Sequence, residues 1–116
     1  MELVLEELNR ATGVVGSFIV DNDGIVVASD VSVGADAERC SALVSSLTNA
    51  AEKALSRLGG GAVTSGFFEM DQWKIFFQKQ EIGHLVALAE PTANLGLVRM
   101  ELKQASKRLA ASASTR

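Results

Sequence analysis

The chain has 116 residues, a formal charge of −3 at pH 7 and 47% hydrophobic residues. This length fits one domain with a small core, and a single proline without low-complexity sequence predicts a globular chain. The weak negative charge, without a dense basic patch, argues against a nucleic-acid partner, and no apolar run reaches the roughly 18 residues of a membrane span. We expect one domain over residues 1–116, with an ordered core of about residues 2–110 and a frayed tail over residues 111–116.

The N-terminal sequence and the cysteine content indicate in which cellular compartment the protein is expected. The first residues, MELVLEEL, are acidic and lack the basic start and small-residue cleavage site of a signal peptide. Cys40 is the single cysteine, so it cannot form an internal disulfide. A reducing compartment fits best, and we expect the protein to be cytoplasmic.

The first expected elements are a short helix and a β-hairpin. Residues 1–13 carry apolar side chains at helical spacing, with acidic residues early and Gly13 at the end. The segments VVGSFIV (14–20) and IVVAS (25–29) favour strands. Residues 21–24 between them are Asn, Asp and Gly types, which tolerate the positive φ of a tight hairpin turn.

Residues 36–58 predict the longest helix. They contain no glycine or proline, Asp36 is a natural N-cap, and glycines follow at residues 59–61. The apolar side chains recur at helical spacing, so we expect them to face the core. This expected core stripe consists of Cys40, Leu43, Val44, Leu47, Ala51, Ala54, Leu55 and Leu58.

The second half of the chain predicts three strands and a final helix. Strands are expected within 62–70, 73–80 and 84–90, and the short gaps between them suit an antiparallel meander. Residues 93–111 predict a helix with one narrow apolar stripe. The fold class is therefore α+β: a five-stranded antiparallel sheet with helices packed on it.

The glycine-bearing segments do not match ligand-binding loops. A calcium loop of EF-hand type that began at Asp21 would need glycine at its sixth position and glutamate at its twelfth, where this chain has Val26 and Ser32. Residues 59–61 follow a helix, whereas a phosphate-binding loop precedes one. We interpret the first segment as a structural turn and the second as a helix stop.

The reactive side chains do not form a recognisable catalytic set. Cys40 lies on the expected core stripe, and His84 begins a strand without other ligands or a nucleophile near it in the sequence. We therefore expect no enzyme activity, no metal and no cofactor.

Two segments predict interaction surfaces. Opposite the expected core stripe, the long helix gathers Ala42, Ser45, Ser46 and Asn49, whose small side chains would let another backbone approach closely; the alternative is a weakly charged solvent face. The strand segment AVTSGFF is uncharged, and at a sheet edge its unpaired backbone groups would need cover. Pairing with its copy across a two-fold axis would provide that cover.

Three stretches carry a resemblance to a known family: GVVGSFIVDNDGIVVASD, ALVSSLTNAAEKALSRLGGG and HLVALAEPTANLGLVRMELKQA. Together with the element order they resemble the roadblock (dynein light-chain-type) family, particularly its MglB-like single-domain members from bacteria and archaea, over roughly residues 2–110. The resemblance implies the order α-β-β-α-β-β-β-α with profilin-like layering. It also implies homodimers in which the central helices lie side by side and the sheets join through the third strand.

The resemblance also implies a function. Such dimers bind small Ras-like GTPases, as scaffolds or as activators of GTP hydrolysis. Carried onto this chain, the GTPase-binding platform corresponds to Ala42, Ser45, Ser46, Asn49 and Lys53. The dimer interface corresponds to Ser41, Thr48, Val63, Ser65 and Phe67. A heterodimer with a paralogue, and a small-molecule-sensing or general protein-interaction domain without a GTPase, remain alternatives.

Overall fold

The structure is a computed structural model that describes residues 1–31 and 36–114. Its elements are α1 (Glu2–Asn9), β1 (Val14–Asp21), β2 (Val26–Val31), α2 (Ala37–Leu55), the 3-10 helix η1 (Ser56–Leu58), β3 (Ser65–Glu69), β4 (Lys74–Lys79), β5 (Gly83–Ala89) and α3 (Leu95–Ser114). This order and the α+β class confirm the expected fold.

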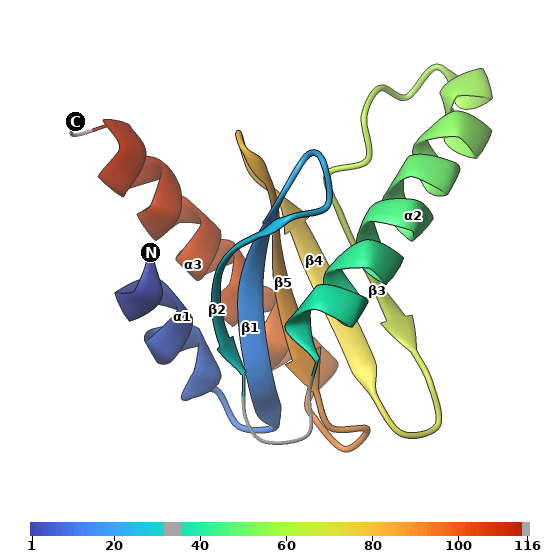
Figure 1. Ribbon diagram of the computed structural model, residues 1–116. Helices are drawn as coiled ribbons and strands as arrows, with labels where there is room; N and C mark the ends of the chain where they lie inside the picture. Colours follow the sequence, from blue (N-terminus) through green and yellow to red (C-terminus); the bar gives the residue numbers. More distant parts are fainter. Residues whose placement is uncertain (32–35, 115–116) are drawn as a thin grey trace.

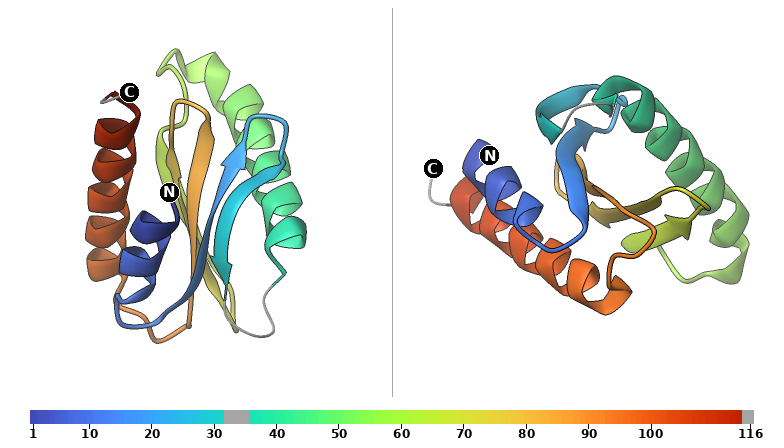
Figure 2. Two further views of the ribbon diagram at one scale, coloured as in Figure 1. Left: turned by 60° about the vertical axis from the view of Figure 1, so that its left-hand side comes forward. Right: turned by 90° about the horizontal axis from the view of Figure 1, so that it is seen from below.

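The five strands form one antiparallel sheet in the order β2-β1-β5-β4-β3. The strand after the long helix, β3, is therefore an edge strand, which is the position that an interaction role for this strand would need. Figure 1 shows α1 and α3 together on one side of the sheet and α2 on the other. The view from below in Figure 2 separates these three layers clearly.

Each face of the sheet has its own apolar core, because successive strand residues point to opposite faces. On the α1 and α3 side, Leu5 and Leu8 pack with Ile19, Phe76 and other buried side chains. On the α2 side, the buried cluster consists of Phe18, Val20, Val44, Ile75, Phe77, Val86 and Leu88. Only one member of that second cluster, Val44, comes from α2. The long helix thus contributes far fewer buried apolar side chains to this core than the sheet does.

Local capping explains where α2 begins and ends. The Asp36 carboxylate accepts a hydrogen bond from the Arg39 N–H at 3.1 Å, as expected for an N-cap. At the other end η1 adds a turn, and Gly59 adopts the left-handed conformation with φ of 72°. Both limits of the predicted helix are confirmed.

The acidic turn after β1 is held by its own side chain. The Asp21 carboxylate accepts hydrogen bonds from the N–H groups of Asp23 and Ile25, at 2.9 and 3.0 Å. Gly24 has a φ of 84°, which favours glycine. This carboxylate therefore organises the hairpin. Ser32, which the calcium-loop comparison used, lies outside the described residues.

The last helix is longer than expected. It continues to Ser114, whereas the sequence predicted an end at residue 111 and a frayed tail beyond it. The segment after 109 is rich in Ala and Ser and has no glycine or proline to stop a helix. Residues 115 and 116 lie outside the described part of the chain.

A glycine substitution tests the contact between β1 and β5. A Cβ atom at Gly83 would lie 1.9 Å from the Val20 carbonyl oxygen, so the backbone of β1 would have to move. We expect Gly83→Ala to lower the free energy of unfolding by about 2–4 kcal/mol, measured by urea denaturation. In the control Gly60→Ala, the new atom meets nothing within 4 Å. Equal stability of the two variants would contradict the described packing.

Candidate interaction surfaces

The side of α2 that faces the sheet is built mainly from hydroxyl side chains. Ser41, Val44 and Thr48 are the buried residues of this helix. The Ser41 hydroxyl donates to the Gly24 carbonyl oxygen at 2.7 Å, and the Thr48 hydroxyl donates to the Val44 carbonyl oxygen at 2.9 Å. These bonds satisfy both hydroxyls, so the helix can sit on the sheet without unpaired polar groups at these positions.

The expected core stripe of α2 is largely wrong. Leu43 and Leu47 are 54% and 42% exposed, and the same holds for Leu55 and Leu58 at the end of the helical segment. The helix is rotated so that the small hydroxyl residues approach the hairpin turn at Gly24, and this places the leucines outside. Of the expected stripe only Val44 is fully buried, with Cys40 and Ala51 half-buried.

Cys40 has the environment of a structural side chain. It packs against the apolar cluster under α2. Burial, and after it the nearby Asp36 carboxylate, raise the pKa of the Cys40 thiol. The thiol form is therefore favoured over the reactive thiolate.

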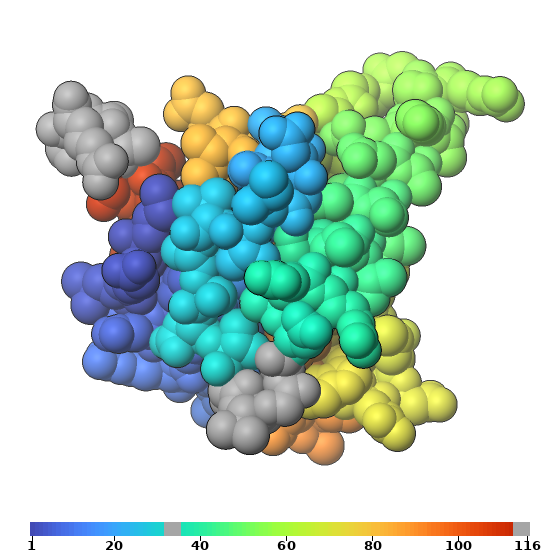
Figure 3. All heavy atoms as spheres, in the orientation of Figure 1, coloured from blue at the N-terminus to red at the C-terminus, as the bar shows by residue number. Residues whose placement is uncertain are grey.

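The exposed leucines continue into a stripe along α2. Leu43, Leu47, Ala50 and Ala54 follow one another at spacings of four, three and four, which places them on one side of the helix, and all four are exposed. We call these four residues the leucine stripe. Figure 3 shows that α2 forms an uncovered flank of the molecule. A contiguous exposed apolar surface of this kind indicates an interaction site.

A second exposed side of α2 carries the expected platform. Ala42, Ser46, Asn49 and Lys53 are exposed and also follow a spacing of four, three and four. Ser45 is half-buried, because its hydroxyl lies against the glycine of the hairpin turn. Thus α2 has three sides: a hydroxyl side on the sheet, the leucine stripe, and this small-residue platform.

The expected dimer-interface residues are found in three different environments. Ser41 and Thr48 face the sheet of their own chain, so their side chains offer no surface to a partner. Val63 is half-buried against the core beneath α2. Ser65 and Phe67 lie on the free edge strand β3, and Phe67 is 37% exposed beside Phe76.

A small polar hollow separates the C-terminal half of α2 from the sheet. Eight residues line it: Asp21, Asn22, Ser45, Thr48, Asn49, Glu52, Lys79 and His84. Glu52 and Lys79 form an ion pair at 3.8 Å across it. The His84 ring lies against Phe77, and its Nε2 atom is buried without a hydrogen-bond partner among the described residues. Burial, and then the Lys79 cation, lower the pKa of His84.

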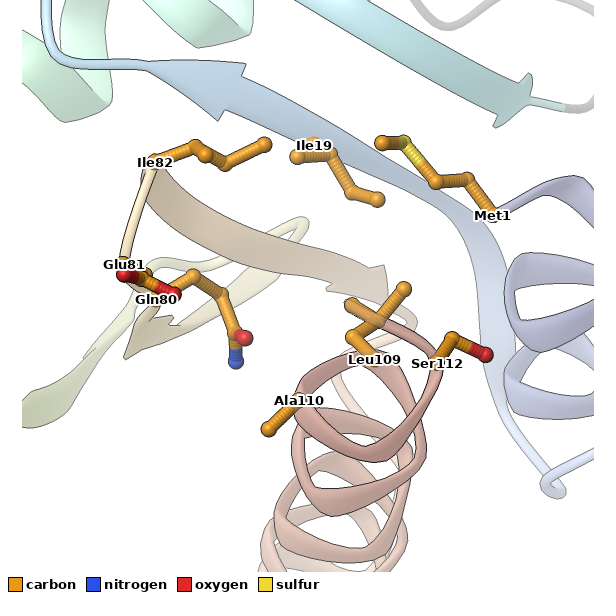
Figure 4. Close-up of a pocket in the computed structure, with 8 residues that line it drawn as sticks. All are labelled: Met1, Ile19, Gln80, Glu81, Ile82, Leu109, Ala110 and Ser112. Atoms are coloured by element: carbon orange, nitrogen blue, oxygen red, sulfur yellow. The ribbon is translucent and has the colours of Figure 1, made fainter. Parts of the chain in front are cut away.

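A larger hollow of about 320 Å³ lies on the opposite side of the sheet. Figure 4 shows it between the start of α1, the end of α3 and the β4–β5 turn, with Ile19 as its floor. Its walls are mainly apolar, with Gln80, Glu81 and Ser112 as the polar groups. Its volume is at the lower end of the range for ligand sites, which begins near 300 Å³.

Among the described residues, neither hollow groups side chains that could hold a metal ion. In residues 1–31 and 36–114, no three His, Cys, Asp or Glu side chains are grouped so that they could hold a metal ion. His84 and Cys40, the residues considered for catalysis, do not contact each other in any described interaction. Within the same described ranges, no helix is both long and apolar enough to cross a membrane.

Comparison with known proteins identifies the family. A sequence model of the Roadblock/LC7 domain matches residues 1–89, which covers every element from α1 to β5. The chain belongs to the Roadblock/LC7 domain family. This membership confirms the family resemblance of the sequence.

Relatives of this Roadblock/LC7 chain cover it almost completely. The uncharacterized protein MJ1340 of Methanocaldococcus jannaschii is 34% identical over 111 residues, which span 96% of this chain and 97% of the relative. The gliding protein MglB from Thermus thermophilus is 26% identical, with a TM-score of 0.87 over 99% of this chain and 89% of that one. A structure described as MglB with tetrameric arrangement is also 26% identical, with a TM-score of 0.85 over 95% and 85% of the two chains.

The buried imidazole predicts a pH dependence of stability. Because folding lowers the pKa of His84 below its ordinary value of 6.5, the unfolded chain binds more protons near and below that pH. The free energy of unfolding is therefore expected to fall as the pH decreases through 6.5 towards the lower folded pKa, and to be regained on return to higher pH. His84→Gln should remove this part of the dependence in urea denaturation at fixed protein concentration. An unchanged pH slope in the variant would contradict the assignment.

Proposed function

We propose that this Roadblock/LC7 chain is a non-enzymatic cytoplasmic regulator or scaffold, which forms a homodimer and binds a small Ras-like GTPase through paired α2 helices. The observation that carries the proposal is the leucine stripe of α2, exposed on a helix that its own chain holds with few apolar contacts. Burial of apolar surface is the main driving force of association, so a second copy on this stripe would gain stability.

Two further features support self-association. The edge strand β3 leaves unpaired backbone groups next to the α2 side of the molecule, and a two-fold axis beside β3 would extend the sheet into a second copy. The related MglB structure with a tetrameric arrangement shows that a chain of this fold can associate. In the proposed homodimer the contact surface on α2 is the leucine stripe, and on the sheet it is β3 with Ser65 and Phe67.

Pairing of the leucine stripes would leave the platform residues free for a third protein. Ala42, Ser46 and Asn49 have short side chains, so a partner backbone could approach the two helices closely. Lys53 adds one positive charge, and Ser45 borders this surface. We expect any effect on the GTPase to act through the switch conformation that the chain binds. Scaffold and activator share this contact and differ only in whether the bound conformation hydrolyses GTP faster.

The oligomer is tested by a charge placed on the leucine stripe. We expect the wild-type protein to have twice the 12.2 kDa mass of the chain in sedimentation equilibrium, and Leu47→Asp to have the mass of one chain at micromolar concentration. Leu3→Asp is the matched control, because Leu3 is also an exposed leucine but lies on α1. A wild-type monomer at several hundred micromolar, or equal effects of both variants, would contradict the proposal.

The GTPase partner is tested by binding. Immobilised protein is expected to retain a small Ras-like GTPase loaded with a GTP analogue, and to retain the GDP form at least about tenfold less well. Ser46→Arg with Asn49→Arg should abolish retention while the protein remains a dimer, because two long cations would occupy the close-approach surface.

The matched control for this binding test is Gln72→Arg with Gln104→Arg, which adds the same charge at exposed positions away from α2. Binding that is indifferent to nucleotide, or lost equally in both double variants, would contradict the platform. Tight thermal stabilisation by a metabolite, lost on filling the hollow in Figure 4, would instead favour the small-molecule-sensing alternative.

A further inference from the structure

The free edge of β3 has a defined hydrogen-bonding pattern. Thr64 and Met70 each bond to β4 through their backbone, at 2.7 and 2.8 Å. Hydrogen-bonded and non-bonded positions alternate along an antiparallel strand, so the even-numbered residues of β3 face β4 with their N–H and C=O groups. The backbone groups of Ser65, Phe67 and Glu69 therefore point outward, away from the sheet.

This pattern restricts how a second copy can pair with β3. Antiparallel pairing across a two-fold axis joins outward-pointing residues to each other. If the two-fold axis passes through Phe67, the middle residue of β3, all three outward-pointing residues of each strand are paired with the other strand. In this register Ser65 lies opposite Glu69 of the partner subunit, with Cα atoms about 5.5 Å apart.

The side chains of the outward-pointing residues lie on the α3 side of the sheet. Phe67 is paired with Phe76, and their rings stack with centroids 5.8 Å apart. Phe76 belongs to the core under α1 and α3, and cross-strand neighbours share a face. Ser65, Phe67 and Glu69 alternate with the residues that face α2, so a carboxylate brought to Ser65 would lie beside α3.

Two cations of α3 lie next to Ser65. Arg99 and Lys103 line a shallow groove together with Ser65, Gly66 and Gln78 of β3 and β4. They are exposed and one helical turn apart, and neither forms an ion pair with any residue in the described part of the chain. A patch with two unpartnered cations beside an open strand edge fits a partner strand that carries a carboxylate.

Glu69 has the matching charge on the same strand. Its cross-strand neighbour is Lys74, but the Lys74 ammonium donates to the Ala93 carbonyl oxygen at 3.0 Å. Glu69 is exposed and forms no ion pair with a described residue. Each copy thus holds a carboxylate at one end of β3 and two cations beside the other end.

We propose that Arg99 and Lys103 of one subunit bind the carboxylate of Glu69 from the β3 strand of a second copy, so that two identical inter-subunit ion pairs fix the register of the joined sheets. This inference rests on the self-association proposed above. A slip of the register by two residues would move the carboxylate away from both cations and leave outward-pointing backbone groups unpaired at the strand ends. The surface thus selects a copy of this chain over a paralogue whose third strand lacks the acidic residue.

The test measures the dissociation constant of the dimer by sedimentation at several salt concentrations. Glu69→Lys is expected to weaken the dimer at least about tenfold at low salt, because two attractive pairs become repulsive. Arg99→Glu with Lys103→Glu should weaken it similarly. An equimolar mixture of these two variants should form heterodimers, since both sites of the mixed dimer then pair opposite charges. The variant that carries all three substitutions should likewise regain both sites as a homodimer. High salt should reduce all these differences.

The control Glu6→Lys makes the same charge change on the exposed surface of α1. A dimeric wild type whose dissociation constant is unaffected by Glu69→Lys, or a triple variant no tighter than its parents, would overturn the ion pairs and leave self-association standing. A wild-type protein that is monomeric throughout would overturn the self-association itself.

Discussion

The packing of α2 against the sheet is the constraint on which the rest of the structure depends. A serine at position 41 lets the helix approach the β1–β2 turn, and its hydroxyl bonds to the carbonyl of Gly24. A leucine there would hold the helix away from the turn and would bury no polar bond. Because hydroxyl residues occupy this side, the larger apolar side chains of the helix are turned outward. The same rotation of the helix also exposes the small-residue platform. One packing arrangement therefore exposes both the leucine stripe and the platform.

Much of this architecture could be predicted from local sequence signals. The turn at residues 21–24, the Asp36 cap and the glycine stop after residue 58 each act through neighbouring residues, and all three are found as expected. The stripe of α3 is also confirmed, since Val98, Leu102 and Ala105 are buried. These features depend on chemistry within a few residues of the chain.

The orientation of α2 could not be predicted in the same way. Helical periodicity reveals that an apolar stripe exists, but it does not say which surface covers that stripe. In α2 the hydroxyl residues are also spaced as a helical stripe. Their contact with the sheet becomes clear only from the position of the Gly24 carbonyl, to which Ser41 bonds. The leucines were therefore assigned to the wrong side, and the platform was correctly expected to be exposed apart from Ser45. The cations of α3 and Glu69 were missed, because nothing local connects residues thirty positions apart.

The open edge of β3 and the leucine stripe of α2 are compatible with the same two-fold arrangement. A two-fold axis beside β3 would continue the sheet, and the same axis would bring the two α2 helices together on one face of the joined sheets. Association then does not depend on either feature alone: the strand edge supplies directional hydrogen bonds, and the leucine stripe supplies apolar burial. The charges beside β3 select the register at which both can form.

Amide hydrogen exchange along β3 tests the central claim, that two copies join at this strand, most directly. Gly66 and Phe68 direct their N–H groups to β4, so they are protected in any folded form and serve as internal references. At concentrations where the protein is a dimer, the outward-pointing N–H of Phe67 should exchange as slowly as theirs, and dilution should release it. Rapid exchange of Phe67 at every concentration, with Gly66 and Phe68 still protected, would show that the edge stays open and would contradict the account.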